Sequence, residues 1–275
     1  MESFDGFDGR TAVITGAGGG IGAGLARALG ERGARLVLAD IQEAPLAETA
    51  GELATLGHDV ATHVCDVRDL DAVESLATFA DERFGGAQIL CNNAGVAAYG
   101  LLADQDVDDW RFVMDVDFWG VMHGIKAFVP RMIAAGTGGH ILNTASMAGL
   151  IGMPGLGIYS AAKFGVVGVS EALRAELKPH GIGVSVLCPM MVSTALNSNS
   201  DHIRAGMQGK PSGELISEEN TAGLAGDVMS VDELVDAAIR GITDSRLHIL
   251  THRDQADILE HRARRLADAA ERVQR

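Results

Sequence analysis

Short apolar runs alternate with longer amphipathic segments along most of the chain. The runs are nearly all apolar, as in strands covered on both faces, and they predict strands over residues 11–15, 35–40, 60–65, 88–92, 140–145, 183–188 and 247–250. Apolar residues that recur every three or four positions predict helices over residues 21–32, 44–56, 70–84, 107–135, 158–178 and 231–241. Strands that alternate with helices indicate βαβ units. We therefore expect one doubly wound α/β domain with a parallel seven-stranded sheet and helices on both faces.

Two segments break this alternation. Residues 190–229 are rich in Gly, Ser and Asn without clear periodicity, and a connection this long is often a lid over a site. Its interior, residues 195–226, carries five glycines and few large apolar residues, so we expect a substrate lid that stays mobile until a ligand orders it. Residues 253–273 have helical periodicity and many charges, and they predict a C-terminal helical tail that is exposed or contacts another subunit.

Composition narrows the class of protein. The 275 residues are 47% hydrophobic and include no Pro- or Ser-rich linker, which favours a single domain over residues 1–275. A formal net charge of −15 disfavours a nucleic-acid partner. Cys65, Cys91 and Cys188 lack metal-ligand spacing, so we expect no metal site and a reducing, cytoplasmic location. The polar N-terminus and the apolar runs, all shorter than a membrane span, predict neither a signal peptide nor a membrane segment.

A glycine-rich turn, TGAGGGIG at residues 15–22, follows the first predicted strand. Glycine lets the backbone approach a pyrophosphate without Cβ clashes, and the free amides of the next helix face the negative charge. Asp40 ends the second predicted strand, 18 residues beyond Gly22. A carboxylate there can accept both ribose hydroxyls of NAD and would repel the 2′-phosphate of NADP. The pattern therefore predicts a Rossmann-type site for NAD.

A second motif lies at the start of the helix predicted over residues 158–178. Tyr159 and Lys163 are four residues apart and share one helical face. An ammonium group near a phenol favours the phenolate, so Lys163 should lower the pKa of Tyr159 toward the range of a useful base. Ser146 closes the fifth predicted strand, 13 residues before Tyr159, and can meet the same substrate oxygen. Together the three residues predict a proton-transfer site.

These motifs, in this order, resemble those of the short-chain dehydrogenase/reductase family over the chain up to about Thr251. The resemblance also rests on Asp66, on NNAG at 92–95 and on PMMVST at 189–194. It implies that Asp66 reads the adenine amino group, that 93–95 flank the adenosine ribose and that Lys163 bonds the nicotinamide ribose. It also implies that 189–194 hold the carboxamide end. The cofactor residues expected on this basis are Gly16, Gly20, Ile21, Gly22, Asp40, Asp66, Val67, Asn93, Ala94, Gly95, Tyr159, Lys163, Pro189, Val192 and Thr194.

The implied reaction interconverts a secondary alcohol and a ketone by hydride transfer. Tyr159 takes the alcohol proton, Ser146 polarises the reacting oxygen, and Lys163 feeds protons through its contact with the ribose. The chain departs from the family at Asp117, where an Asn usually completes the proton relay through its backbone carbonyl. We count Asp117 with the catalytic residues and expect its carboxylate to alter the pH profile. A second departure is Met190, where Gly commonly follows the proline, and its bulk should narrow the pocket.

Apolar residues near the strand ends and in the lid suggest a lipophilic or aromatic substrate. The candidates for the pocket are Ala98, Tyr99, Met147, Met153, Leu156, Met190, Met191 and Leu196. Three alternatives stay open: an NADP-dependent carbonyl reductase, which Asp40 disfavours, a catalytically silent NAD-binding scaffold, and an acidic assembly protein that uses its terminal helix. The resemblance also implies a homotetramer or homodimer built through the helices over 107–135 and 158–178. The second helix would offer a partner the apolar residues Phe164, Val167, Ala172 and Leu173.

Overall fold

The computed structural model describes residues 4, 6–208 and 227–273, and its centre is one parallel sheet of seven strands. The strand order is β3-β2-β1-β4-β5-β6-β7. Strands β1 to β3 extend the sheet in one direction and β4 to β7 in the other, so the order reverses between β1 and β4. The strands are β1 (Thr11–Thr15), β2 (Arg35–Asp40), β3 (Val60–Val64), β4 (Ile89–Asn92), β5 (Gly139–Thr144), β6 (Ile182–Cys188) and β7 (His248–Leu250). The predicted doubly wound α/β fold is confirmed, and the reversal is where such sheets bind ligands.

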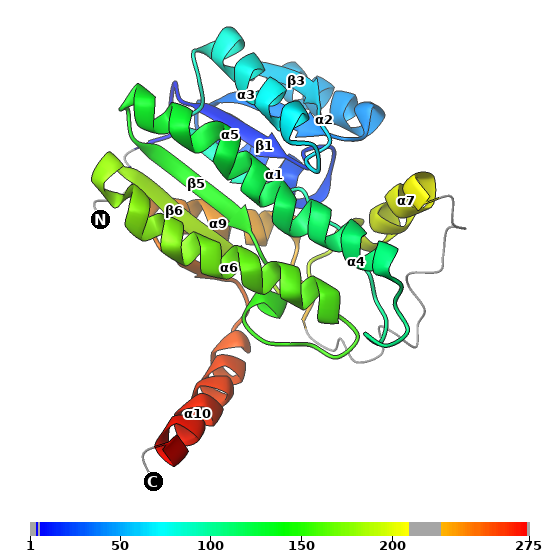
Figure 1. The fold of residues 1–275 in the computed structure, drawn as a ribbon. Helices are drawn as coiled ribbons and strands as arrows, with labels where there is room; N and C mark the ends of the chain where they lie inside the picture. The colour runs from blue at the N-terminus through cyan, green and yellow to red at the C-terminus, as the bar shows by residue number, and fades with distance from the viewer. Residues whose placement is uncertain (1–3, 5, 209–226, 274–275) are drawn as a thin grey trace.

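Helices cover both faces of this sheet (Figure 1). The core of one face includes Leu25, and its helices are α1 (Gly20–Gly30), α2 (Glu43–Thr55) and α9 (Val231–Thr243). The core of the other face includes Phe128, and its longer helices are α3 (Leu70–Phe84), α5 (Gly120–Ala135) and α6 (Gly157–Leu177). Short 3-10 turns are η2 (Met147–Gly149) and η3 (Lys178–His180). Apolar packing on both faces explains why the strands are nearly all apolar.

The helix predicted over residues 107–135 consists of three consecutive pieces. It begins as α4 (Val107–Met114), widens into a π-helical turn, η1 (Asp115–Trp119), and continues as α5. A π turn takes up extra residues within a helix and so changes which side chains face inward beyond it. Here it carries Asp117, whose side chain is fully buried. The sequence pattern predicts the helix and misses this local widening.

The segment 190–229 contains a helix that its sequence does not predict. Residues Leu196–Gln208 form α7, so the expectation of an irregular loop is wrong for this part. The helix is mostly polar, and it is held by buried polar contacts of Ser200 and Arg204 in place of an apolar stripe. The rest of the predicted lid, residues 209–226, lies outside the described residues.

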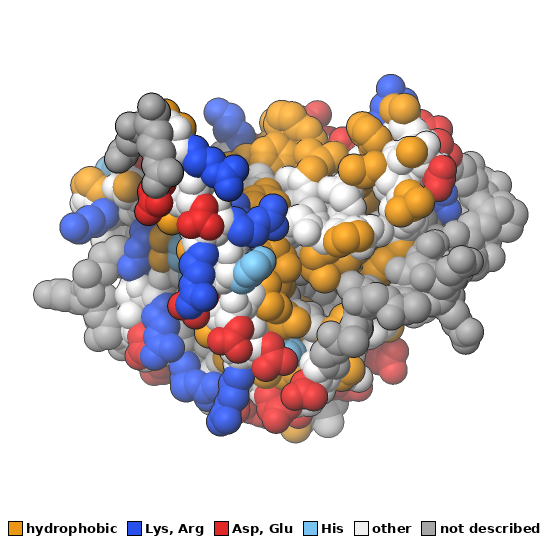
Figure 2. Space-filling model, turned by 90° about the horizontal axis from the view of Figure 1, so that it is seen from below, with side chains coloured by type: hydrophobic (Ala, Val, Ile, Leu, Met, Phe, Trp, Pro, Cys, Tyr) orange, Lys and Arg blue, Asp and Glu red, His pale blue; other side chains and the backbone are white. Residues whose placement is uncertain are grey.

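The last helix, α10 (Gln255–Val273), extends away from the body of the protein (Figure 1). Gln255 at its start is fully buried, and the Arg262 guanidinium lies 5.5 Å from the centre of the Phe164 ring on α6. Farther along, α10 is exposed, and charged side chains of both signs lie beside a surface where hydrophobic side chains gather (Figure 2). None of the helices in the described ranges is long and apolar enough to cross a membrane.

The outward face of α6 is less apolar than the sequence suggests. Val167 and Leu173 are each only 6% exposed and belong to the core, so they are not left for a partner. Ala172 is exposed and Phe164 is half-buried. A larger apolar side chain at the surface is Trp119 of η1, which is 50% exposed.

Candidate active site

A cavity of about 420 Å³ opens along the carboxyl ends of the strands. Residues that follow β1, β2, β4, β5 and β6 line it, together with residues from α6 and α7. The backbone of a parallel sheet brings these loops together at one edge, where the strand order reverses. The described residues gather no group of three or more His, Cys, Asp or Glu side chains that could hold a metal ion.

The glycine-rich turn needs glycine at two positions for different reasons. Gly16 has a φ of 66°, and a Cβ on it would lie 2.8 Å from the Ala94 Cα. A Cβ on Gly22 would collide with the Gly16 carbonyl oxygen beneath the turn. Gly16 and Gly20 line the cavity, but Gly22 does not, so the predicted contact of Gly22 with the cofactor is replaced by a packing role.

The start of α1 suits the pyrophosphate of a dinucleotide. This helix has no side chain capping its N-terminus and no acidic residue in its first turn. Its first amides therefore need an acceptor, and the helix dipole favours a negative one. Ile21 lines the cavity at this point, and nothing lies within 4 Å of where a Cβ of Gly19 would be. The residues present fit NAD or NADP at this end of the cavity.

Asp40 lies at the edge of the cavity with its carboxylate already oriented. Its Oδ2 accepts a hydrogen bond from the Gly18 amide and its Oδ1 accepts one from the Gln42 amide, both at 2.9 Å. Each oxygen keeps a further lone pair for a ribose hydroxyl. In the part of the chain that the structure describes, Lys163 is the only Lys or Arg that lines the cavity. This arrangement disfavours a 2′-phosphate beside Asp40.

Asp66 also lines the cavity, and Arg68 holds its carboxylate with two nitrogens. The Arg68 Nη2 donates to Asp66 Oδ2 at 2.6 Å, and the Arg68 Nε donates to Asp66 Oδ1 at 3.0 Å. Burial by itself would raise the pKa of Asp66, but the hydrogen bonds and charge of Arg68 outweigh it and hold the pKa below its usual value. Val67 lines the cavity next to Asp66.

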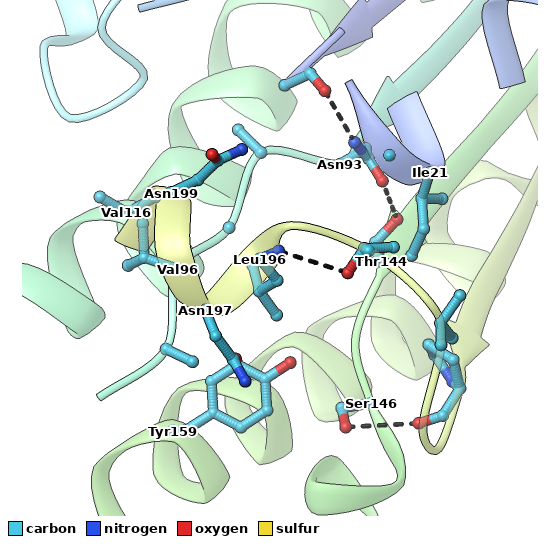
Figure 3. Close-up of a pocket in the computed structure, with 18 of the residues that line it drawn as sticks. Ile21, Asn93, Val96, Val116, Thr144, Ser146, Tyr159, Leu196, Asn197 and Asn199 are labelled. Carbon is cyan, nitrogen blue, oxygen red and sulfur yellow. Dashed lines mark hydrogen bonds between the residues drawn. The ribbon is translucent and has the colours of Figure 1, made fainter. Parts of the chain in front are cut away.

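The loop after β4 is fixed by the side chain of Asn93. Its Nδ2 donates to the Thr15 carbonyl at 3.0 Å. Its Oδ1 accepts a hydrogen bond from the Thr144 hydroxyl at 3.2 Å (Figure 3). These bonds tie together the ends of β1, β4 and β5, so the Asn93 amide shapes the cavity wall. Asn93, Ala94 and Gly95 all line the cavity.

Ser146, Tyr159 and Lys163 lie together beside this loop. Ser146 precedes η2, Tyr159 is in the first turn of α6, and Lys163 is one turn later; all three line the cavity. The Lys163 ammonium donates to the Thr144 carbonyl at 3.0 Å and lies 5.4 Å from the centre of the Tyr159 ring. The Ser146 hydroxyl is 3.4 Å from the Pro189 carbonyl that accepts its hydrogen bond. The predicted trio thus meets in one place.

Asp117 does not line the cavity but lies against Lys163. Its Oδ2 is 3.2 Å from the Lys163 Nζ, and its Oδ1 accepts a hydrogen bond from the Val96 amide at 2.7 Å. Burial raises the pKa of Asp117, while Lys163 and the Val96 amide act in the opposite direction. Asp117 is therefore a positioning residue: it holds Lys163 and the Val96 amide, and its charge acts on Tyr159 from outside the cavity.

The pKa of Tyr159 is shifted in the direction opposite to the one expected from the sequence. Burial raises the pKa of this phenol above its ordinary value, the Asp117 carboxylate raises it further, and a hydrogen bond with Ser146 opposes the change. Lys163 was expected to lower this pKa, but its charge is balanced by Asp117 at 3.2 Å. The structure therefore presents Tyr159 as a protonated phenol at neutral pH, ready to donate its proton.

The cavity wall at Pro189 is supported by the start of α10, near the C-terminus of the chain. Pro189, Val192 and Thr194 line the cavity as predicted, and Gln255 of α10 donates from Nε2 to the Cys188 carbonyl at 2.6 Å. Ile258 of α10 lines the cavity as well. The sequence could not indicate these two, because their place depends on how α10 starts. The thiol of Cys188 is buried, which raises its pKa to about 12.

Most predicted pocket residues line the same cavity. They are Tyr99, Met147, Met153, Leu156, Met190, Met191 and Leu196. The prediction for Ala98 is wrong, because its side chain is fully buried in the core. Its neighbours Ala97 and Tyr99 line the cavity, since alternate residues here face opposite ways. Further lining residues that the sequence motifs do not indicate include Ile151, Asn197, Asn199, Ile203 and Ile258.

The family model described as short chain dehydrogenase matches residues 10–204. The chain is 42% identical over 196 residues to a putative oxidoreductase, SadH, of Mycobacterium tuberculosis, covering 70% of this chain and 71% of that protein. It is 36% identical over 246 residues to 1-deoxy-11-beta-hydroxypentalenate dehydrogenase of Streptomyces avermitilis, covering 89% and 85%. A crystal structure of a short chain dehydrogenase/reductase from Burkholderia phymatum in complex with NAD has a TM-score of 0.87 and 34% identity, covering 96% and 97%. This chain therefore belongs to the short-chain dehydrogenase/reductase family.

Proposed function

We propose that this protein is an NAD-dependent oxidoreductase that interconverts a lipophilic secondary alcohol and its ketone. The observation that carries the proposal is the meeting of Ser146, Tyr159 and Lys163 in the same cavity as the glycine-rich turn. A proton carrier and a dinucleotide cradle that share one cavity suit a reaction in which a proton and a hydride leave the same carbinol group. The similar dehydrogenase from Streptomyces avermitilis is named for a hydroxylated compound, and this supports the same reaction class.

The chain supplies proton transfer and orientation. When bound, the nicotinamide ring accepts or donates the hydride. Tyr159 exchanges the proton of the reacting oxygen, and the Ser146 hydroxyl turns from the Pro189 carbonyl to donate to that oxygen. Lys163 would hold the nicotinamide ribose, while Thr144 and Asp117 keep its ammonium in place. The raised pKa of Tyr159 keeps the phenol protonated at neutral pH, so alcohol oxidation, which needs the phenolate, should be faster in alkaline solution.

We propose NAD as the cofactor and not NADP. The support is the Asp40 carboxylate, whose two oxygens are already oriented by the Gly18 and Gln42 amides. A 2′-phosphate would meet this negative charge with no basic partner among the described cavity residues other than Lys163. An NADP-dependent reductase is the alternative. A silent NAD-binding scaffold is less favoured because it would not need Tyr159 and Lys163.

The proposed substrate has an apolar body. The cavity that Tyr159 lines is also lined by Met147, Met153, Leu156 and Met190, and methionine adapts to irregular ligands. We also propose a homotetramer or homodimer that buries the exposed face of Trp119, and a cytoplasmic location, which the three free, buried cysteines support.

An absorbance assay tests the proposal. The protein is mixed with NAD or NADP and a panel of aryl and alkyl secondary alcohols at pH 7 and pH 9, and NADH formation is followed. The reverse panel uses ketones with NADH or NADPH. The proposal predicts turnover with NAD(H) on several lipophilic members and a higher kcat/KM than with NADP(H). A higher kcat/KM with NADP(H) would overturn the cofactor assignment, and no turnover on either panel would overturn the reaction.

A further inference from the structure

A polar contact joins two residues that line the cavity from different parts of the chain. The Tyr99 hydroxyl donates a hydrogen bond to the Asn197 Oδ1 at 2.9 Å, and both residues line the cavity. Tyr99 comes from the loop after β4, and Asn197 comes from the first turn of α7. Asn197 extends from α7 toward Tyr159 (Figure 3). The same cavity is also lined by the apolar residues Met147, Met153, Leu156, Met190 and Leu196.

Two other contacts hold α7 in place, one to the loop after β4 and one to α4. The Ser200 hydroxyl accepts a hydrogen bond from the Ala97 amide at 2.9 Å and donates to the Leu196 carbonyl at 2.6 Å. Farther along α7, Arg204 forms an ion pair with Asp109 of α4 at 2.6 Å, and both are nearly buried. Side chains fixed in this way lose little further freedom when they bind a ligand.

The hydrogen-bonding capacity of the pair is only partly used. Asn197 Oδ1 accepts from Tyr99, which leaves the Asn197 Nδ2 with no hydrogen-bond partner among the described residues. Burial raises the pKa of Tyr99, and the neighbouring Tyr159 raises it further, so the Tyr99 hydroxyl keeps its proton and fixes the orientation of the amide. An amide N–H covered by a purely apolar ligand would lose its hydrogen bond to water without replacement.

We propose that the Asn197 amide, oriented by Tyr99, donates a hydrogen bond to a second oxygen on the substrate, near the reacting carbon. This inference rests on the proposed function and narrows its substrate class. The favoured substrate is an apolar secondary alcohol or ketone that also carries an ether, hydroxyl or carbonyl oxygen. Such an oxygen satisfies the Asn197 Nδ2, whereas a methylene in its place leaves that donor unpaired.

Two substrates that differ in one atom test this. In 1-phenyl-2-methoxyethanol an ether oxygen takes the place of a methylene of 1-phenylbutan-1-ol. The natural protein should have a kcat/KM about 10-fold higher for the ether, as expected for one well-formed hydrogen bond. Asn197→Ala should lower kcat/KM for the ether and leave kcat/KM for 1-phenylbutan-1-ol unchanged, so that the ratio falls to near 1. Asn197→Asp should invert the ratio, because a carboxylate accepts hydrogen bonds only. Ser198→Ala, an exposed neighbour on α7, is the matched control and should keep the ratio.

Equal losses on both alcohols in Asn197→Ala would show that the pair only holds α7 in place, and the proposal would fail. An equal kcat/KM for the two alcohols in the natural protein would also overturn it. Calorimetric binding of the two matching ketones to the NADH-loaded protein gives the same comparison without turnover. Tighter binding of the ether ketone that is lost in Asn197→Ala would support the inference, even if neither alcohol is oxidised. The absence of oxidation would then count against the proposed reaction alone.

Discussion

The Lys163 ammonium lies 3.2 Å from the Asp117 carboxylate, and their side chains are only 3% and 0% exposed. Both groups sit next to the phenol that is proposed to carry the proton. The positive charge that would favour a phenolate is thus neutralised by a carboxylate that favours the phenol. The balance between these two charges should determine the pH at which alcohol oxidation begins.

Asp117→Asn should move that pH downward. The substitution keeps the side-chain shape and removes the negative charge that raises the Tyr159 pKa, so Lys163 can act on the phenol unopposed. Because the phenolate takes the alcohol proton, a lower pKa lets oxidation start at lower pH. The acid limb of the kcat/KM profile should therefore shift to lower pH. Loss of one partner of a buried ion pair should also destabilise the fold by about 3 kcal/mol.

Asp109→Asn is the matched control, since it makes the same chemical change in the buried ion pair with Arg204. It should lower the Tm as well but leave the acid limb in place. An unchanged limb in Asp117→Asn, or an equal shift in both variants, would contradict the role assigned to Asp117.

Asp40→Ser combined with Ile41→Arg should change cofactor choice. The serine removes the repulsion of a 2′-phosphate, and the arginine supplies a partner for it. We expect the ratio of kcat/KM for NADP to that for NAD to rise by about 100-fold, or about 2.7 kcal/mol. Ile41→Arg alone, with Asp40 still present, should show a much smaller rise. No change in the ratio for the double variant would indicate that Asp40 does not contact the ribose.

Most of the fold follows from sequence patterns, and the features that do not follow have physical reasons. Nearly uninterrupted apolar runs predict strands such as β1 because both sheet faces are covered. Helix α7 is missed because buried contacts of Ser200 and Arg204 hold it, and such partners are not visible in local periodicity. The side chain of Ala98 is misplaced because alternation along a short irregular stretch has no sequence signal.

The electrostatics of the site were the least predictable part. The motif Tyr159/Lys163 indicates that the two side chains share a helical face, and they do meet. The direction of the Tyr159 pKa depends on the burial of the phenol and on Asp117, which the π turn η1 directs inward. The spacing of Tyr159 and Lys163 indicates neither the burial of the phenol nor the position of Asp117.

Breaking the Arg204–Asp109 ion pair should loosen α7. Arg204→Gln removes the positive charge that the nearly buried Asp109 carboxylate contacts, so the contact between α7 and α4 weakens. Amide hydrogen exchange in residues 196–206 should become at least about 10-fold faster, and KM should rise more for bulky alcohols than for small ones. Exchange as slow as in the natural protein would show that the ion pair does not hold the helix.

The exposed indole of Trp119 should lie in a subunit interface. Trp119 is 50% exposed in the single chain, and Trp119→Glu places a charge there that should dissociate the oligomer. Light scattering at micromolar concentration should give a tetramer or dimer for the natural protein and a smaller species for the variant. Leu56→Glu, at the end of α2 and 61% exposed, is the control and should leave the mass unchanged. A monomeric natural protein would contradict the proposed assembly.

The most direct test of the proposed chemistry is Tyr159→Phe, which removes one oxygen and keeps the ring that lines the cavity. Calorimetry should show NAD binding within about threefold of the natural protein, because the glycine-rich turn and Asp40 are untouched. On an alcohol that the natural protein oxidises, kcat should fall by about 10²–10⁴-fold, the usual contribution of a positioned proton carrier. A kcat near that of the natural protein, with NAD still bound, would show that Tyr159 does not carry the proton and would contradict the mechanism.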